Sequence, residues 1–173
     1  MNQAFETQLQ VVQRALGDAV LPALINAEPY VIEQLHLSMA ALGFMQQRLR
    51  YERGYYRCTV LNYISMAEAI IELFVDSKDA EIGELDALIV KGRALLDSPA
   101  ADVIDYRHFT AELRASIAAL TAASQNSAYE SALDALIIDR SGPILMQERV
   151  WCIPLGFELR PQDLAEPDWE RIA

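Results

Sequence analysis

Residues 29–76 read PYVIEQLHLSMAALGFMQQRLRYERGYYRCTVLNYISMAEAIIELFVD, and this stretch decides the fold. It consists of two long apolar runs joined by a basic segment, residues 48–57, that reads RLRYERGYYR. In each run the apolar residues recur at the spacing of one face of an α-helix. Gly54 tolerates the left-handed conformation that ends many helices, so the first helix is expected to end there. The stretch therefore predicts a helical hairpin whose corner is residues 48–57.

The flanking sequence extends this pattern in both directions. A first helix is expected over residues 3–20, where the apolar stripe consists of Phe5, Leu9, Val12, Leu16 and Val20. After the hairpin, Ser77, Ser98 and Ser127 have the residue type and position of helix N-caps, and Pro143 is expected to end the last helix. These features predict an all-α fold, an antiparallel bundle of about six helices with the hairpin at its centre.

The composition changes after the expected last helix. Residues 155–160 alternate apolar with polar or glycine positions, a pattern typical of a short strand pair or an extended arm. We therefore expect a helical bundle over residues 1–143 and a short irregular or extended appendage over residues 144–173. The appendage is expected to pack on the bundle or on a partner, with Trp151 and Trp169 as its packing or anchoring residues.

The charge of the chain limits its partners. The formal net charge is −11, and the corner, with four arginines and Glu52, is locally basic. An acidic chain is repelled by nucleic acid and by anionic membranes, so neither is expected as a partner. No uncharged apolar run reaches the roughly 18–20 residues of a membrane span. Cys58 and Cys152 stand far apart and no signal peptide is recognisable, so a cytoplasmic location is expected.

The corner is the first candidate site. Its members are Arg48, Arg50, Arg53, Tyr55, Tyr56 and Arg57. Arginine and tyrosine are frequent at the centres of protein–protein interfaces, which suggests a partner surface. Guanidinium groups at the start of a helix could also fork a phosphate or carboxylate, which suggests a small anionic ligand. A purely structural role, in which the arginines complement the end of the preceding helix and pair with surface carboxylates, is the interpretation that the sequence favours over both.

The two histidines form the second candidate site. Each follows a carboxylate by three positions, in Glu33-x-x-His36 and in Asp105-x-x-His108. The spacing is similar to the Glu-x-x-His pairs of the ferritin-like di-iron proteins, although one pair has Asp and the expected hairpin link is short. A site for Fe, Mn or Zn would draw on Glu33, His36, Glu68, Glu72, Glu84, His108 and Glu112. A solvated helix face explains both pairs without a metal, and no cofactor is expected in the leading interpretation.

The chain contains no glycine-rich phosphate loop, no serine elbow and no recognisable Cys/His nucleophile arrangement. The leading hypothesis is therefore a non-enzymatic interaction or adaptor protein whose partner is another protein or a second copy in a homodimer. The alternative is a helical-bundle enzyme or ligand binder that uses the carboxylate/histidine metal site or the Arg/Tyr corner.

Overall fold

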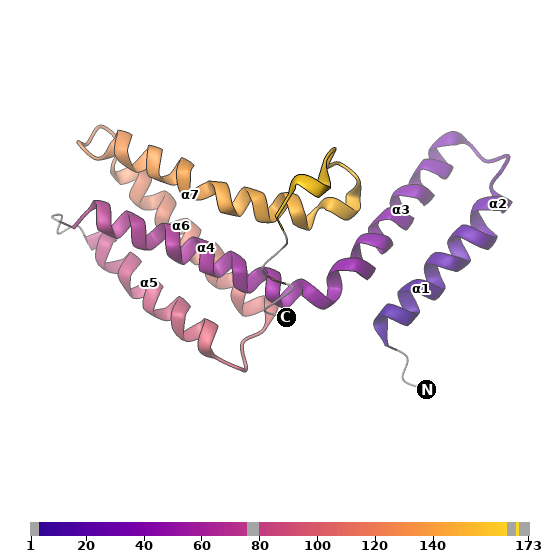
Figure 1. Cartoon of the computed structure of the whole chain (residues 1–173), viewed down its shortest axis with the longest axis horizontal. Helices are drawn as coiled ribbons and strands as arrows, with labels where there is room; N and C mark the ends of the chain where they lie inside the picture. Colours follow the sequence, from indigo (N-terminus) through magenta and orange to yellow (C-terminus); the bar gives the residue numbers. More distant parts are fainter. Residues whose placement is uncertain (1–3, 76–79, 166–168, 170–173) are drawn as a thin grey trace. The chain divides into compact units, whose positions relative to one another are not determined.

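The computed structural model describes residues 4–75, 80–165 and 169 (Figure 1). It is 83% helical, with five long helices, and the described residues form no strand. The predicted all-α class is confirmed, with five long helices in place of six. The expected cap Ser77 lies outside the described residues. None of the helices in the described ranges is long and apolar enough to cross a membrane.

The elements follow one another along the chain in two compact units. They are α1 (Phe5–Ala15), the π-helical turn η1 (Leu16–Val20), α2 (Leu21–Ala23), α3 (Pro29–Arg48), the 3₁₀ turn η2 (Leu49–Tyr51), α4 (Glu52–Leu73), α5 (Ala80–Asp97), α6 (Val103–Ala123), α7 (Glu130–Trp151), η3 (Ile153–Leu155) and η4 (Pro161–Asp163). Unit 1 comprises Met1–Arg50 and Arg149–Leu164, and unit 2 comprises Tyr51–Glu148 and Ala165–Ala173. The expected boundary at residue 143 stays a prediction, although α7 runs continuously across it.

Unit 2 is built on three closely packed helices, α4, α5 and α6 (Figure 1). Its most deeply buried large side chains are Val60, Ile70, Leu85, Tyr106, Leu113, Leu133 and Trp169. α4 and α6 run in the same direction, because Arg107 lies over the Tyr56 ring and Arg114, seven residues later, lies over the Tyr63 ring. The cation-to-centroid distances are 5.8 and 5.9 Å, within the range of a cation–π interaction.

The predicted end of the first hairpin helix at Gly54 is wrong. The helical path is interrupted earlier, by the 3₁₀ turn η2, and Gly54 lies in the first turn of α4. Glycine is needed there for close approach, since a Cβ at this position would lie 2.6 Å from the main-chain oxygen of Trp169. The packing partners of α4 are α5 and α6, whereas α3 packs on α1 and η3 within unit 1.

The expected start of α6 at Ser98 is also wrong. Asp102 is the N-cap, and its side chain accepts a hydrogen bond from the main-chain N–H of Val103. Asp105 completes a capping box by accepting from the main-chain N–H of Asp102 at 2.9 Å. This reciprocal pair satisfies two amides that a helix start otherwise leaves without partners.

The expected stop at Pro143 is wrong, because α7 continues to Trp151. Residues 155–160 form no strand: Leu155 ends a 3₁₀ turn, and residues 156–160 are irregular, as the alternative of an irregular appendage expected. Proline removes one amide donor, and the carbonyl that loses it belongs to Asp139, which is exposed to water. Side-chain contacts on both sides of the proline hold the helix. Leu133 is buried on one side, and on the other Gln147 Nε2 donates to Thr59 Oγ1 at 2.8 Å. Tertiary packing therefore offsets the local cost of the proline.

In unit 1, α1 and α3 form an antiparallel pair (Figure 1). Gln13 Nε2 donates to the main-chain oxygen of Met39 at 3.5 Å, and a Cβ on Gly43 would lie 3.1 Å from the same nitrogen. A Cβ on Gly17 would lie 3.4 Å from Met39 Cε. A Cβ at either glycine would therefore meet only the end of a flexible side chain, at an ordinary distance for Gly17 and a slightly tight one for Gly43.

An ion pair ties the segment after α7 to the end of that helix. Arg149 Nε and Nη2 each donate to a carboxylate oxygen of Glu158 at 3.0 Å. The hydrogen bond from Arg149 lowers the pKa of Glu158, and the same bond raises the pKa of Arg149.

The pair predicts a specific pH dependence. A carboxylate whose pKa is lowered in the folded state stabilises the fold at pH values above the ordinary Glu pKa of about 4.3. This contribution to the free energy of unfolding is lost as the pH falls through the lowered pKa. In an NMR titration the Glu158 carboxyl is expected to titrate below that ordinary value. In the Arg149→Ala variant the Glu158 carboxyl should titrate close to the ordinary Glu value. An unchanged Glu158 midpoint in the variant would contradict the assignment.

Candidate groove between α4, α6 and α7

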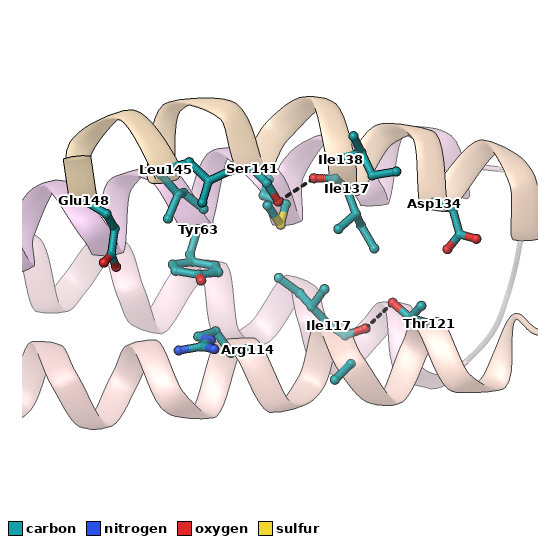
Figure 2. Close-up of a pocket in the computed structure, with 13 residues that line it drawn as sticks. Tyr63, Arg114, Ile117, Thr121, Asp134, Ile137, Ile138, Ser141, Leu145 and Glu148 are labelled. Carbon is teal, nitrogen blue, oxygen red and sulfur yellow. Dashed lines mark hydrogen bonds between the residues drawn. The ribbon is translucent and has the colours of Figure 1, made fainter. Parts of the chain in front are cut away.

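An open groove of about 830 Å³ runs along α7 in unit 2 (Figure 2). It is lined by Tyr63 and Met66 of α4, by Arg114, Ile117, Ala118 and Thr121 of α6, and by Asp134, Ile137, Ile138, Ser141, Ile144, Leu145 and Glu148 of α7. All of these residues belong to the same compact unit.

The groove exists because α7 is held at its two ends within unit 2. At one end the Tyr129 ring lies 4.5 Å from the Phe74 ring, and Leu133 enters the core. At the other end Gln147 Nε2 donates to the main-chain oxygen of Tyr55 at 2.9 Å. Between these anchors α7 does not approach α4 and α6 as closely as those helices approach each other. The small side chain of Ala118 on the facing wall leaves the intervening space open.

The walls of the groove are largely apolar. Two hydroxyls that face it are bonded to the main chain of their own helices (Figure 2): Ser141 Oγ donates to the Ile137 oxygen at 2.7 Å, and Thr121 Oγ1 donates to the Ile117 oxygen at 2.8 Å. Hydroxyls engaged in this way make little further demand for a partner. The remaining walls are mainly isoleucine and leucine, so the groove suits apolar side chains.

Three charged residues lie at the edges of the groove. Arg114 lies on the α6 wall beside the Tyr63 ring, and Asp134 and Glu148 project from opposite ends of the α7 wall (Figure 2). Within the described ranges none of these three side chains is part of an ion pair. Their charges therefore remain available to a bound molecule.

The structure divides the predicted Arg/Tyr corner between the two units. In unit 1, Arg48 is buried and donates to the main-chain oxygens of Trp151 at 2.9 Å and Val150 at 2.8 Å. These carbonyls belong to the last turn of α7, where a cation satisfies both their hydrogen bonding and the helix dipole. The Arg48 guanidinium also lies 5.4 Å from the Trp151 ring centroid. Arg50 is exposed in η2.

In unit 2, Arg53 and Arg57 meet at the hydroxyl of Tyr106. Arg57 Nη1 donates to that hydroxyl at 3.1 Å and to the main-chain oxygen of Leu96 at 2.7 Å. Arg53 donates to the same hydroxyl at 3.5 Å and to the main-chain oxygen of Ala101 at 3.4 Å. These arginines therefore bind the end of α5 and the α5–α6 connection. The contacts favour a structural role, and the anion-binding interpretation stays a prediction.

The two corner tyrosines also contact other side chains of unit 2. The Tyr55 ring makes edge contacts with the Tyr56 ring at 5.1 Å and with the Trp169 ring at 5.6 Å. Tyr56 is half-buried beneath Arg107. Trp169 thus packs against its own chain.

The predicted metal ligands do not converge in the described residues. Glu33 and His36 are exposed on α3 in unit 1, whereas the other candidates belong to unit 2. Two of those others are ion-paired: Glu68 with Arg93, and Glu112 with Lys91 at 2.5 Å. The remaining three, Glu72, Glu84 and His108, are exposed. In the part of the chain that the structure describes, no three His, Cys, Asp or Glu side chains come together as a metal would require.

The sequence analysis did not predict the groove, because a helix that stops at Pro143 would lack the lining residues Ile144, Leu145 and Glu148. The sequence does contain a pattern that indicates a continuous helix. Ile137, Ile144 and Trp151 continue a seven-residue apolar spacing through the proline, which one uninterrupted helix face would produce.

Comparison with known proteins adds no family to this description. No protein-family model matches the chain, and neither a curated protein nor a solved structure matches it.

Proposed function

We propose that the chain is a non-enzymatic interaction protein whose groove between α4, α6 and α7 binds an amphipathic helix of a partner protein. The observation that carries this proposal is an apolar groove of about 830 Å³ whose edge charges have no ion partner among the described residues. Helix-in-groove recognition places apolar side chains of the bound helix, spaced three, four and seven residues apart, into such a groove.

The groove also limits the length and charge of the bound helix. From Asp134 to Glu148 the α7 wall is about 21 Å long at the rise of an α-helix, so the partner would contribute roughly four turns. An acidic side chain of the partner would pair with Arg114, and a basic one with Asp134 or Glu148. Such complementary charges select the partner and its orientation more than they add affinity.

A matched pair of variants tests this proposal. Ile138 lines the groove and is 74% exposed, whereas Val90 lies on α5 outside the groove and is 64% exposed. Both Ile138→Glu and Val90→Glu place a carboxylate on an exposed apolar position, so each should change stability by less than about 0.5 kcal/mol. Ile138→Glu is expected to weaken capture of a partner by about tenfold or more, because a buried carboxylate must be desolvated.

The measurement is affinity capture with the wild-type chain, followed by titration of each captured protein against the two variants. Val90→Glu should bind as the wild type does. A second variant, Ala118→Trp, fills the groove without adding charge and should weaken the same partner, while Ala119→Trp, at an exposed position of α6 that does not line the groove, should not. Equal binding by the wild type, Ile138→Glu and Ala118→Trp would reject the groove as the binding surface.

The cytoplasmic location and the absence of nucleic-acid and membrane partners expected from the sequence belong to this proposal. The alternative enzyme or ligand binder stays a prediction. It has less support, because Arg48, Arg53 and Arg57 donate to main-chain carbonyls, and no three of the candidate metal ligands come together in the part of the chain that the structure describes.

A further inference from the structure

Unit 1 contains an apolar helix face that it does not cover by itself. In α1 and η1 the residues Phe5, Leu9, Val12 and Leu16 are spaced by four, three and four positions. This alternation is the pattern of the apolar stripe along which helices pack in bundles and coiled coils, and these four residues form the α1 seam. Phe5 is 73% exposed and Val12 is 45% exposed, while Leu9 and Leu16 are half-buried.

The partner helix α3 leaves Phe5 and Val12 of this seam exposed. The hydrogen bond between α1 and α3 joins Gln13 and Met39, and Gly17 of η1 lies beside Met39. No residue of α1 is buried, and Arg48 is the only buried residue of α3. Two helices in this arrangement do not enclose a core, and α1, with 11 residues, is of a length at which an isolated helix is marginally stable in water. Unit 2, in contrast, has an extensive core of its own.

We infer that a second copy of the chain covers this face, so that two α1–α3 pairs form a four-helix bundle about a two-fold axis. A two-fold interface uses the same patch on both copies, and both seams would be covered at once. This inference concerns unit 1 and does not depend on the groove of unit 2.

The small net charge of unit 1 favours a second copy of the chain as the partner that covers the apolar face. Residues 1–50 carry four acidic and three basic side chains, so they contribute −1 to the formal net charge of −11. Two copies can therefore approach through this part of the chain with little repulsion. A strongly basic protein or an anionic surface would find little opposite charge here to recognise it.

The available area also agrees with a dimer. α3 has 20 residues. At the ordinary dimensions of a helix it is about 30 Å long, and a pair of helices is about 20 Å wide, so one copy offers a face of roughly 600 Å². Two copies would bury about 1,200 Å² in total, which reaches the lower limit of stable, specific interfaces.

Sedimentation equilibrium of the full chain tests this inference. At about 10 µM, a concentration at which standard-size interfaces associate, the wild type is expected to be a dimer. Val12→Glu and Phe5→Glu place a charge in the seam and should each raise the dissociation constant about tenfold or more. Thr7→Glu adds the same charge to the opposite side of α1 and should leave the dimer unchanged. Circular dichroism checks that all three variants keep the helicity of the wild type.

Each other outcome overturns the inference. A monomeric wild type whose seam amides are protected from hydrogen exchange would show that another part of the same chain covers the face. A monomer with unprotected seam amides would show that nothing covers it. A dimer that resists both seam variants, or that Thr7→Glu weakens equally, would have another interface. Ile138→Glu should leave the dimer intact, so failure of the groove proposal and failure of this one are distinguishable.

Discussion

Replacing Trp169 with alanine is expected to lower the free energy of unfolding by about 3–5 kcal/mol, the usual cost of removing a large buried aromatic side chain. Trp169 is 2% exposed, and its ring makes an edge contact with the Tyr55 ring at 5.6 Å. Its main chain is seated against Gly54 in the first turn of α4. The alanine variant would leave a cavity beside α4 that the neighbouring rings cannot close.

Urea unfolding followed by far-ultraviolet circular dichroism measures this effect without relying on the fluorescence of the tryptophan that is removed. Trp169→Phe keeps an aromatic ring near Tyr55 and is expected to lose less than half as much stability. Leu159→Ala is a control in the same terminal region, because Leu159 is 94% exposed and its truncation should cost less than about 0.5 kcal/mol. A loss of under about 1 kcal/mol in Trp169→Ala would mean that this residue is not part of the core.

Two glycines of α5 are expected to respond in opposite directions to the same substitution. Gly92→Ala should lower the free energy of unfolding by about 1–3 kcal/mol through overpacking. Its Cβ would lie 2.5 Å from Phe109 Cζ and 2.8 Å from Ile64 Cδ1. Phe109 and Ile64 are 3% and 4% exposed, so neither has open space into which to move.

Gly83→Ala is the matched control. A Cβ at position 83 meets nothing within 4 Å, so alanine there should raise stability by up to about 1 kcal/mol through its higher helix propensity. The difference between the two variants isolates the contact from the propensity, because both changes are glycine to alanine in one helix. Stabilisation by both substitutions would show that α5 is not seated against Phe109 as described.

The helical class and much of the helix placement were predictable because apolar spacing is a local property of the chain. The stripe over residues 5–20 lies in α1 and η1, and the start of α7 lies close to Ser127, whose hydroxyl accepts from the main-chain N–H of Tyr129 at 3.1 Å. The error at Ser98 has a local cause, because the capping box of Asp102 and Asp105 starts α6 four residues later. At Gly54 and Pro143, in contrast, the usual local effect of the residue was outweighed by a contact from a distant part of the chain.

The candidate site was less predictable than the fold. Arg48, Arg53 and Arg57 donate to main-chain carbonyls 39 to 103 positions away, as the Arg57–Leu96 and Arg48–Trp151 contacts show, and the partner or anion site expected at the corner stays a prediction. The groove depends on the distance at which α7 packs along α4 and α6. That distance is set by anchors such as Gln147, whose partners no local pattern reveals.

By itself the sequence determined an all-helical, acidic chain with an apolar stripe on most helices, because helix formation and stripe position depend on residues within a few turns of one another. Only the tertiary structure decided that α7 passes through its proline, that Gly54 lies under Trp169, and that an open groove remains beside Ile138. The physical reason is that each of these features results from the packing of elements far apart along the chain, where the sum of many contacts outweighs the local preference of one residue.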